Sequence, residues 1–188
     1  VLHAEDTFSA LIGLARPLAD AFDAQAAVIA EQSRLHVDGD MPREAAAALM
    51  QWLTASTNGD QIVALHTREQ LPENLRSLAG VWCGFLALRF DAIDNGWLVL
   101  ARKEQIETIN WGGKPEKHYV SGPLGPRLTP RGSFDVWKQT VRDTSVPWGA
   151  NDLDFARQLR DELIRASAAR LADTYKARTE LLAVLGHD

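Results

Sequence analysis

The stretch from Val81 to Ala101 reads VWCGFLALRFDAIDNGWLVLA, and it decides the fold. From Val81 to Phe90, apolar side chains occupy both alternating sets of a strand, so both faces of the sheet must be covered. Asn95-Gly96 is a strong turn dipeptide, and the apolar run resumes from Trp97 to Ala101. The stretch therefore predicts the central hairpin of an antiparallel sheet, with helices from both ends of the chain covering it.

Alternation along the first of these strands predicts which side chains share a face. One face is expected to carry Val81, Cys83, Phe85 and Ala87, and the other Trp82, Leu86 and Leu88. The chain has a single cysteine, so Cys83 cannot form an internal disulfide. A lone cysteine among apolar strand residues is typically a small core residue, and this is the role we expect for it.

Shorter elements are predicted on the N-terminal side of the hairpin. Apolar residues three or four apart between Asp6 and Asp23 indicate a packing helix. Further strands are predicted at Ala26 to Ala30, Arg34 to Val37 and Ile62 to Leu65, and an alanine-rich helix starts at Pro42. The predicted fold class is α+β, with an antiparallel sheet flanked by helices.

A helix of more than thirty residues is predicted from Asn151 to His187. Asn151 is its expected N-cap, and Asp154 is placed to meet the exposed amides of the first turn. One apolar set suits packing on the domain and comprises Leu153, Ala156, Leu159 and Leu163. A second set lies on a heptad seam, broken by Arg178, that predicts pairing with another chain; it comprises Ile164, Ala168, Leu171, Tyr175, Leu182 and Leu185.

The segment from Trp111 to Trp148 is too long and irregular for an ordinary connection, and it holds five of the eight prolines. It also holds three tryptophans, and aromatic side chains at that density generally need a partner. Lys114 to Arg142 contains six Lys or Arg and two acids, a balance of 6 − 2 = +4, which leaves −9 for the rest of the chain. The segment therefore reads as a docking arm whose partner is acidic; an ordered surface flap that covers apolar area is the alternative.

Particular residues give this arm its chemistry. Arg131 can form a bidentate bond to a carboxylate, and Ser133 can donate or accept a hydrogen bond. Phe134 and Trp137 share a face in a helix but point to opposite sides in a strand, so refolding would exchange the aromatic that touches a partner. Gly112-Gly113 gives the backbone the freedom to follow such a change.

Two motifs in this arm carry a resemblance. Trp111-Gly112-Gly113-Lys114-Pro115, followed about fifteen residues later by the run from Pro130 to Trp137 (PRGSFDVW), resembles the tongue of the PHY domain in bacterial phytochrome sensor histidine kinases. The resemblance implies a GAF-like fold for residues 1–150, including a tongue arm at about 107–146. It implies that residues 151–188 form a signalling helix that leads into a truncated kinase H-box.

The resemblance also implies how the arm works. The tongue would shield the bilin pocket of an upstream GAF domain, and its contact residues would be Trp111, Gly112, Gly113, Pro130, Arg131, Ser133, Phe134 and Trp137. Arg131 would pair with an acidic residue of that domain in one photostate, and Ser133 would take over in the other. Refolding between hairpin and helix would relay the signal through the C-terminal helix to a histidine kinase. The bilin, biliverdin-like, would belong to the upstream domain, and this chain would bind no cofactor.

His187 has a role only through its position. Leu181 to Asp188 resembles the start of an H-box, which makes His187 the candidate phosphoacceptor of the parent protein. Within this chain we expect no catalytic residue, because neither nucleotide-binding loops nor nucleophile motifs occur. The remaining histidines form no helical pair or Cys/His cluster, so no metal site is predicted.

Composition argues against several other classes of protein. A formal net charge of −5 does not suit a surface built for nucleic acid or anionic membranes. The chain also has no run of roughly 18 apolar residues, the length needed to span a bilayer. With no secretion signal and one cysteine, a cytoplasmic protein is expected. The chain opens on Val1 rather than Met, and we expect it to be cut from a longer protein.

Two other functions stay open at this point. A free-standing GAF-like module could bind a cyclic nucleotide or another small molecule, which would require a roomy polar pocket beside the sheet. The basic, tryptophan-bearing arm could instead stack on single-stranded nucleic acid, although the acidic remainder of the chain would repel the backbone.

Overall fold

A computed structural model describes residues 6–57, 62–107, 119–122, 125–128 and 132–186. For residues 119–122, 125–128 and 132–134 it describes the backbone only. Its central element is a five-stranded sheet with strand order β2-β1-β5-β4-β3, in which all neighbours are antiparallel. The strands are β1 (Ala26–Glu31), β2 (Arg34–Asp38), β3 (Ile62–Leu65), β4 (Trp82–Asp91) and β5 (Gly96–Lys103).

The β4–β5 hairpin lies inside this sheet, as the sequence predicts. Leu86 pairs with Leu100, and β5 continues the sheet on its other side by pairing with β1. In the connecting turn, Asn95 has a φ of +51°, and the Asp91 carboxylate accepts hydrogen bonds from the amides of Ile93 and Asp94. A short polar side chain thus closes the turn that joins two largely buried strands.

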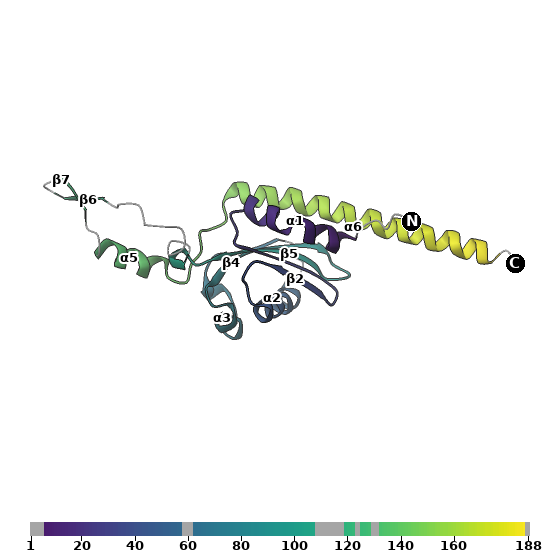
Figure 1. The fold of residues 1–188 in the computed structure, drawn as a ribbon, viewed down its shortest axis with the longest axis horizontal. Coiled ribbons are helices and arrows are strands. Elements are labelled where there is room, and N and C mark those ends of the chain that lie inside the picture. Colours follow the sequence, from purple (N-terminus) through teal and green to yellow (C-terminus); the bar gives the residue numbers. More distant parts are fainter. Residues whose placement is uncertain (1–5, 58–61, 108–118, 123–124, 129–131, 187–188) are drawn as a thin grey trace.

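Helices cover both faces of the sheet (Figure 1). On one face lie α2 (Arg43–Ser56) and α3 (Glu73–Ala79); β3 and the 3-10 helix η1 (Arg68–Gln70) come between them in the sequence. Here Leu49 and Leu75 pack in one buried cluster with Phe85 and Trp97 from the sheet. The predicted two-sided coverage of the hairpin is confirmed.

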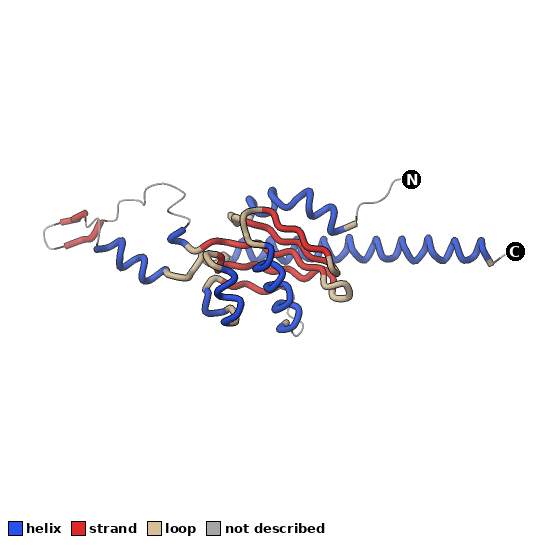
Figure 2. Tube along the Cα trace, turned by 60° about the horizontal axis from the view of Figure 1, so that its bottom comes forward, coloured by secondary structure: helices blue, strands red, loops and turns tan. Residues whose placement is uncertain are grey.

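The other face is covered by α1 (Thr7–Ala21) and α6 (Ala150–Leu185), which run side by side in Figures 1 and 2. The Thr7 and Ser167 hydroxyls lie 3.1 Å apart, and the rings of Phe22 and Phe155 stack with centroids 4.8 Å apart. Because the start of α1 meets the middle of α6 and its end meets the beginning of α6, the two helices are antiparallel.

The predicted face of Trp82 is wrong. Trp82 pairs with Lys103 whereas Gly84 pairs with Arg102, so Cys83 is an extra residue in β4. This bulge changes the alternation, and Trp82 packs in the same cluster as Phe85 rather than with Leu86. Cys83 itself is fully buried, which confirms its predicted place in the core.

The long helix exists as predicted, but it begins earlier. Gly149 is its N-cap, and the carboxylate of Asp152 accepts a hydrogen bond of 2.9 Å from the Gly149 amide. The predicted cap at Asn151 and the predicted role of Asp154 are therefore wrong by two positions; Asp154 instead pairs with Arg157 at 2.8 Å. The Asp152 carboxylate also lies 3.5 Å from the guanidinium of Arg102, near the end of β5.

The apolar residues of α6 divide as predicted, with one exception. Ala156 is fully buried, and Leu153, Leu159 and Leu163 pack partly on the α1 side of the sheet. Ile164, predicted for the seam, packs on the same cluster. Beyond it the seam residues are exposed in this single chain: Leu171, Tyr175, Leu182 and Leu185. Among the described residues, no helix is both long and apolar enough to cross a membrane.

Candidate docking arm and its anchor

The arm leaves the sheet after β5 and returns before α6. Its described parts are a small antiparallel hairpin, β6 (Tyr119–Gly122) with β7 (Gly125–Leu128), and the helix α5 (Gly132–Val141). In Figure 1 these elements project beyond the sheet at the end opposite the C-terminus of α6. The arm and the free half of the long helix thus extend from opposite ends of one domain.

Three of the predicted contact residues lie in α5. Ser133, Phe134 and Trp137 belong to this helix, which places positions 134 and 137 about one turn apart. Trp137 is half-buried, whereas its neighbour Val136 is 64% exposed. The other predicted contact residues, Trp111, Gly112, Gly113, Pro130 and Arg131, lie outside the described residues, as does His187.

Backbone hydrogen bonds fix the base of the arm. An isolated β-bridge joins Thr67 to Thr144, and the Arg68 amide donates to the carbonyl of Asp143 at 2.9 Å. The Ser145 amide donates to His66 at 2.8 Å, while Gln105, just after β5, donates from its amide to the Thr144 carbonyl at 2.8 Å. The returning chain is therefore held between the exits of β3 and β5.

Side chains reinforce this anchor. Arg68 pairs with the Asp143 carboxylate at 3.4 Å and also donates to the carbonyl of Gly80. The Gln105 side chain donates to the Ser145 carbonyl at 3.2 Å. Asp143 adopts a φ of +58°, so the anchor includes a backbone conformation that costs a non-glycine residue energy and that these contacts maintain.

Gly84 allows the returning chain to reach the sheet. A Cβ on Gly84 would lie 2.1 Å from the hydroxyl oxygen of Ser145, which is fully buried. Gly84 is not among the predicted contact residues, although a lone glycine inside a strand is a known signal for a bulge or a close backbone approach. Both features occur here, since the β4 bulge directly precedes it.

Trp148 does not belong with the arm's docking aromatics. It is 9% exposed, and its indole nitrogen donates to the Leu65 carbonyl at 3.0 Å. One of the three tryptophans that predicted a docking surface is therefore a core residue. Among the side chains that the structure describes, Trp137 is the tryptophan that lies in the arm.

An open hollow of about 540 Å³ lies at the base of α5. Its charged lining has both signs, and it comprises Arg68, Glu104, Lys138, Arg142 and Asp143. Ligand sites for small molecules are mostly enclosed and apolar, with few polar groups. This hollow is better described as the space between the anchor and the first turns of the arm.

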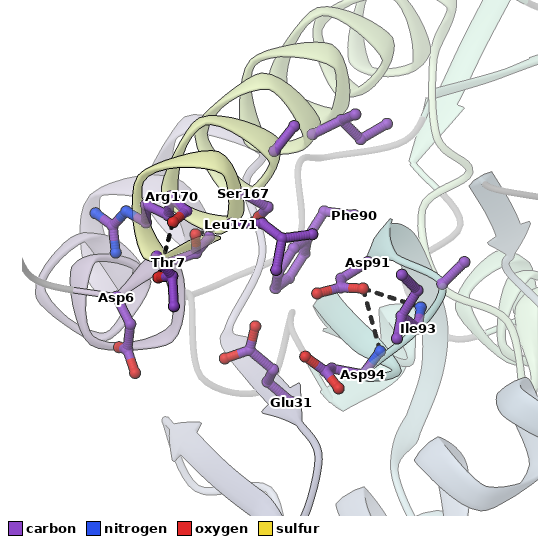
Figure 3. Close-up of a pocket in the computed structure, with 14 residues that line it drawn as sticks. Asp6, Thr7, Glu31, Phe90, Asp91, Ile93, Asp94, Ser167, Arg170 and Leu171 are labelled. Atoms are coloured by element: carbon purple, nitrogen blue, oxygen red, sulfur yellow. Dashed lines mark hydrogen bonds between the residues drawn. The ribbon is translucent and has the colours of Figure 1, made fainter. Parts of the chain in front are cut away.

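A second hollow, of about 430 Å³, lies between the start of α1, the β4–β5 turn and α6 (Figure 3). Phe90 and Leu171 supply apolar surface, and the acidic rim consists of Asp6, Glu31, Asp91 and Asp94. Outside the hollow, Arg34 pairs with both Asp6 and Glu31 at 2.6 Å. Burial raises the pKa of Glu31, against the opposing effect of Arg34.

The acidic hollow does not receive this chain's own arm. It borders residues 164–174 of α6, towards the C-terminal side, whereas the described parts of the arm project from the other end of the domain (Figure 1). Within the described residues, this hollow is therefore not the acidic partner that the charge of the arm predicts.

An α+β domain with a five-stranded antiparallel sheet, a protruding arm and a long exit helix defines the class: this is the GAF-like architecture predicted above. A family model described as the phytochrome region (PHY) matches residues 1–171. The chain belongs to this phytochrome family.

Several relatives support the assignment. A bacteriophytochrome of Pseudomonas aeruginosa is 48% identical over 109 residues, 58% of this chain and 15% of the relative. Cyanobacterial phytochrome A of Nostoc sp. is 31% identical over 188 residues, 98% of this chain and 23% of the relative. A bacteriophytochrome of Xanthomonas campestris is 38% identical over 104 residues, 54% of this chain and 16% of the relative. The chain thus spans less than a quarter of the length of these relatives.

Proposed function

We propose that this chain is the signal-transmitting domain of a red/far-red photoreceptor, and that its arm docks on a bilin-binding GAF domain lying upstream in the same parent protein. Residues 1–150 form the domain, residues 107–146 the tongue arm, and residues 151–188 the signalling helix. The observation that carries the proposal is the arm itself: a basic segment with the PRGSF run leads into α5 and is tied to the core at its base.

The chemistry of the arm suits a dry, acidic docking surface. Arg131 supplies a planar guanidinium that binds a carboxylate with two hydrogen bonds, and Ser133 offers a neutral alternative two residues later. Such a pair lets the same arm contact the same partner in two ways. The arm covers the bilin pocket in both photostates and exchanges one contact for the other as it refolds.

The relay continues through α6. The helix starts next to the anchor of the arm and ends, as a single chain, with exposed apolar residues on the heptad seam. We assign this seam to a homodimer, because exposed leucines at that spacing are stabilised by a partner helix. The helix then leads to a histidine kinase, in which His187 accepts the phosphoryl group.

No bilin is assigned to this chain. Both faces of the sheet are filled by buried apolar side chains, and Cys83 lies fully buried within β4. Burial raises the pKa of the Cys83 thiol to about 12, so it is a poor nucleophile for covalent attachment. These observations support the proposal that the chromophore belongs to the upstream domain.

The test uses the parent protein with its bilin-binding domain restored. Arg131→Ala should change the rate of dark reversion by about tenfold or more, the effect of losing a charge-assisted hydrogen bond in one photostate. Arg142→Ala is the matched control, since it removes an equal charge from an exposed site at the end of the arm. Equal effects of both variants, or unchanged spectra and dark reversion in Arg131→Ala, would contradict the proposed contact of Arg131.

A complementary experiment tests the place of the chromophore. Biliverdin added to the 188-residue chain alone should give no stable, photoreversible absorbance band. Tight photoreversible binding by this chain would show that the bilin site lies here rather than upstream.

A further inference from the structure

A buried arginine stands where the arm, the sheet and the long helix meet. Arg102, near the end of β5, is 6% exposed. One terminal nitrogen of its guanidinium donates to the carbonyls of Val146 and Pro147, each at 3.1 Å. The other donates to the Phe22 carbonyl at 2.6 Å and lies 3.5 Å from the Asp152 carboxylate. One side chain therefore joins the end of β5 to three segments: the C-cap of α1, the returning chain and the first turn of α6.

The guanidinium also packs against the residue that ends the arm. It lies 3.8 Å from the ring centroid of Trp148, whose indole is fixed to β3 through the Leu65 carbonyl. A planar, weakly hydrated cation suits such a site, because it can stack on an aromatic ring and donate in several directions at once. A lysine ammonium would keep the charge but could not make this set of contacts.

Burial of this charge is costly, so the contacts that it makes in the fold need a physical reason. Burial lowers the pKa of Arg102, and the Asp152 carboxylate opposes that effect only in part. Buried ion pairs often stabilise a fold no better than apolar residues of the same size, but in some proteins they fix one particular arrangement. What Arg102 fixes is the position of the returning chain, through Val146 and Pro147, relative to the sheet.

Asp152 connects this position to the helix. Its carboxylate accepts the hydrogen bond from Gly149 that caps α6, and the same oxygen faces Arg102. The returning chain runs from the anchor at Thr144 and Ser145 to this cap. If the arm pulls its anchor, the carbonyls move, the guanidinium follows, and the carboxylate that caps the helix changes its geometry.

We propose that Arg102 is a positioning residue that couples the anchor of the arm to the first turn of α6. The inference rests on the proposed function for the direction of the signal, with the arm as input and the helix as output. The coupling itself is a property of this chain, and it can be measured without light or chromophore.

The experiment is a double-mutant cycle read by amide hydrogen exchange in the 188-residue chain. Arg68→Ala weakens the arm's anchor by removing the ion pair with Asp143. It should lower the protection of amides 153–156, in the first turns of α6, by about fivefold, which is the size of losing one helix cap. In an Arg102→Gln background the same change should alter these amides by less than about twofold, the range expected for independent sites.

A merely structural role for Arg102 predicts another result. Arg102→Gln would then lower the melting temperature, while Arg68→Ala would still alter amides 153–156 by the same factor in both backgrounds; this additivity would overturn the proposal. Arg16→Ala is the control, because it removes the exposed ion pair between Arg16 and Asp38. It should leave the protection of amides 153–156 unchanged.

A second variant keeps the inference testable if Arg102→Gln does not fold. Asp152→Asn preserves a side-chain oxygen for the cap but removes the charge that faces Arg102. It should reduce the effect of Arg68→Ala on α6 while the helix stays capped, and an undiminished effect would overturn the proposal. Coupling in this chain without any effect of Arg131→Ala in the parent protein would refute the proposed function and leave the role of Arg102 standing.

Discussion

The sheet core and the arm use their residues in opposite ways. In β4 and β5 nearly every side chain is buried; one face packs against α2 and α3, and the other against α1 and α6. In α5, Val136 is 64% exposed, and the contacts that hold the arm gather at its base, between Thr144 and the exits of β3 and β5. Both regions are rich in apolar and aromatic residues. The core buries its apolar side chains within the domain, whereas Val136 of the arm is exposed.

This difference shows that the described contacts that stabilise the domain gather in the sheet core and at the base of the arm. A core that is packed on both faces has one arrangement, because small shifts of close-packed side chains are costly. The proposed function requires an arm that exchanges its partner contacts while its base stays fixed to this core. The expected consequences are ordered below from the largest effect to the smallest.

The largest contrast should be in thiol reactivity. Cys83 is fully buried, and burial raises the pKa of its thiol to about 12. At pH 8 it should react with a thiol reagent at least about a thousandfold more slowly than a cysteine introduced by Val136→Cys, because the thiolate is the nucleophile. Comparable rates at the two positions would mean that the core opens as readily as the arm.

Truncation should separate the two regions in stability. Phe85→Ala removes a side chain that is 1% exposed and should lower the free energy of unfolding by about 3–5 kcal/mol. Val136→Ala, in the arm, should change it by no more than about 0.5 kcal/mol. Urea unfolding measures both. A loss of more than about 1.5 kcal/mol in Val136→Ala would show that α5 packs on the core.

Local patterns predicted most of the core. The Val81 to Ala101 hairpin and the long helix follow from residues that are neighbours in the sequence, and both are present. The predicted face of Trp82 failed because the bulge at Cys83 depends on pairing with Lys103 and Arg102 in the next strand. The predicted cap of α6 failed because Asp152 is held by Arg102, fifty residues away in the sequence.

The candidate site was less predictable than the core. Its motif residues could be recognised by resemblance, since WGGKP and PRGSF are local runs. The anchor could not be recognised in that way, because its hydrogen bonds join His66, Arg68 and Gln105 to a chain some forty or more residues further on. Gly84 was the one local signal for it, and Arg102 looks like any charged residue at the end of a strand.

The contact between the core and the arm can be tested at Gly84. Gly84→Ala places a Cβ 2.1 Å from the Ser145 hydroxyl, so the returning chain must shift, and we expect a loss of about 1–3 kcal/mol in unfolding free energy. Gly13→Ala is the matched control. A Cβ at this exposed helical position meets nothing within 4 Å, and alanine should stabilise the helix by up to about 1 kcal/mol.

A double variant makes the test at Gly84 specific. Ser145→Gly removes the hydroxyl and the Cβ that the new methyl group meets, so it should recover part of the loss in Gly84→Ala. If the double variant is as unstable as the sum of its two single changes, the clash is not the cause. The close approach of the arm's base to β4 would then contribute little to stability.

The smallest effect should come from acid, and it should act on the rim of the core rather than on its centre. Asp6 caps α1 by accepting from the Ser9 amide at 2.8 Å, and these hydrogen bonds, together with Arg34, lower the pKa of Asp6 to about 2. Because this pKa lies below the ordinary value of 3.8, the stabilising contribution is complete above pH 4 and is lost as the pH falls towards 2. Since the Asp6 side chain is 48% exposed, solvent screening should keep the effect below about 1 kcal/mol.

Asp6→Asn keeps a capping oxygen but removes the charge, so its unfolding free energy should vary less between pH 4 and pH 2 than that of the unsubstituted chain. An unchanged pH dependence in Asp6→Asn would mean that the acid sensitivity of the domain arises elsewhere.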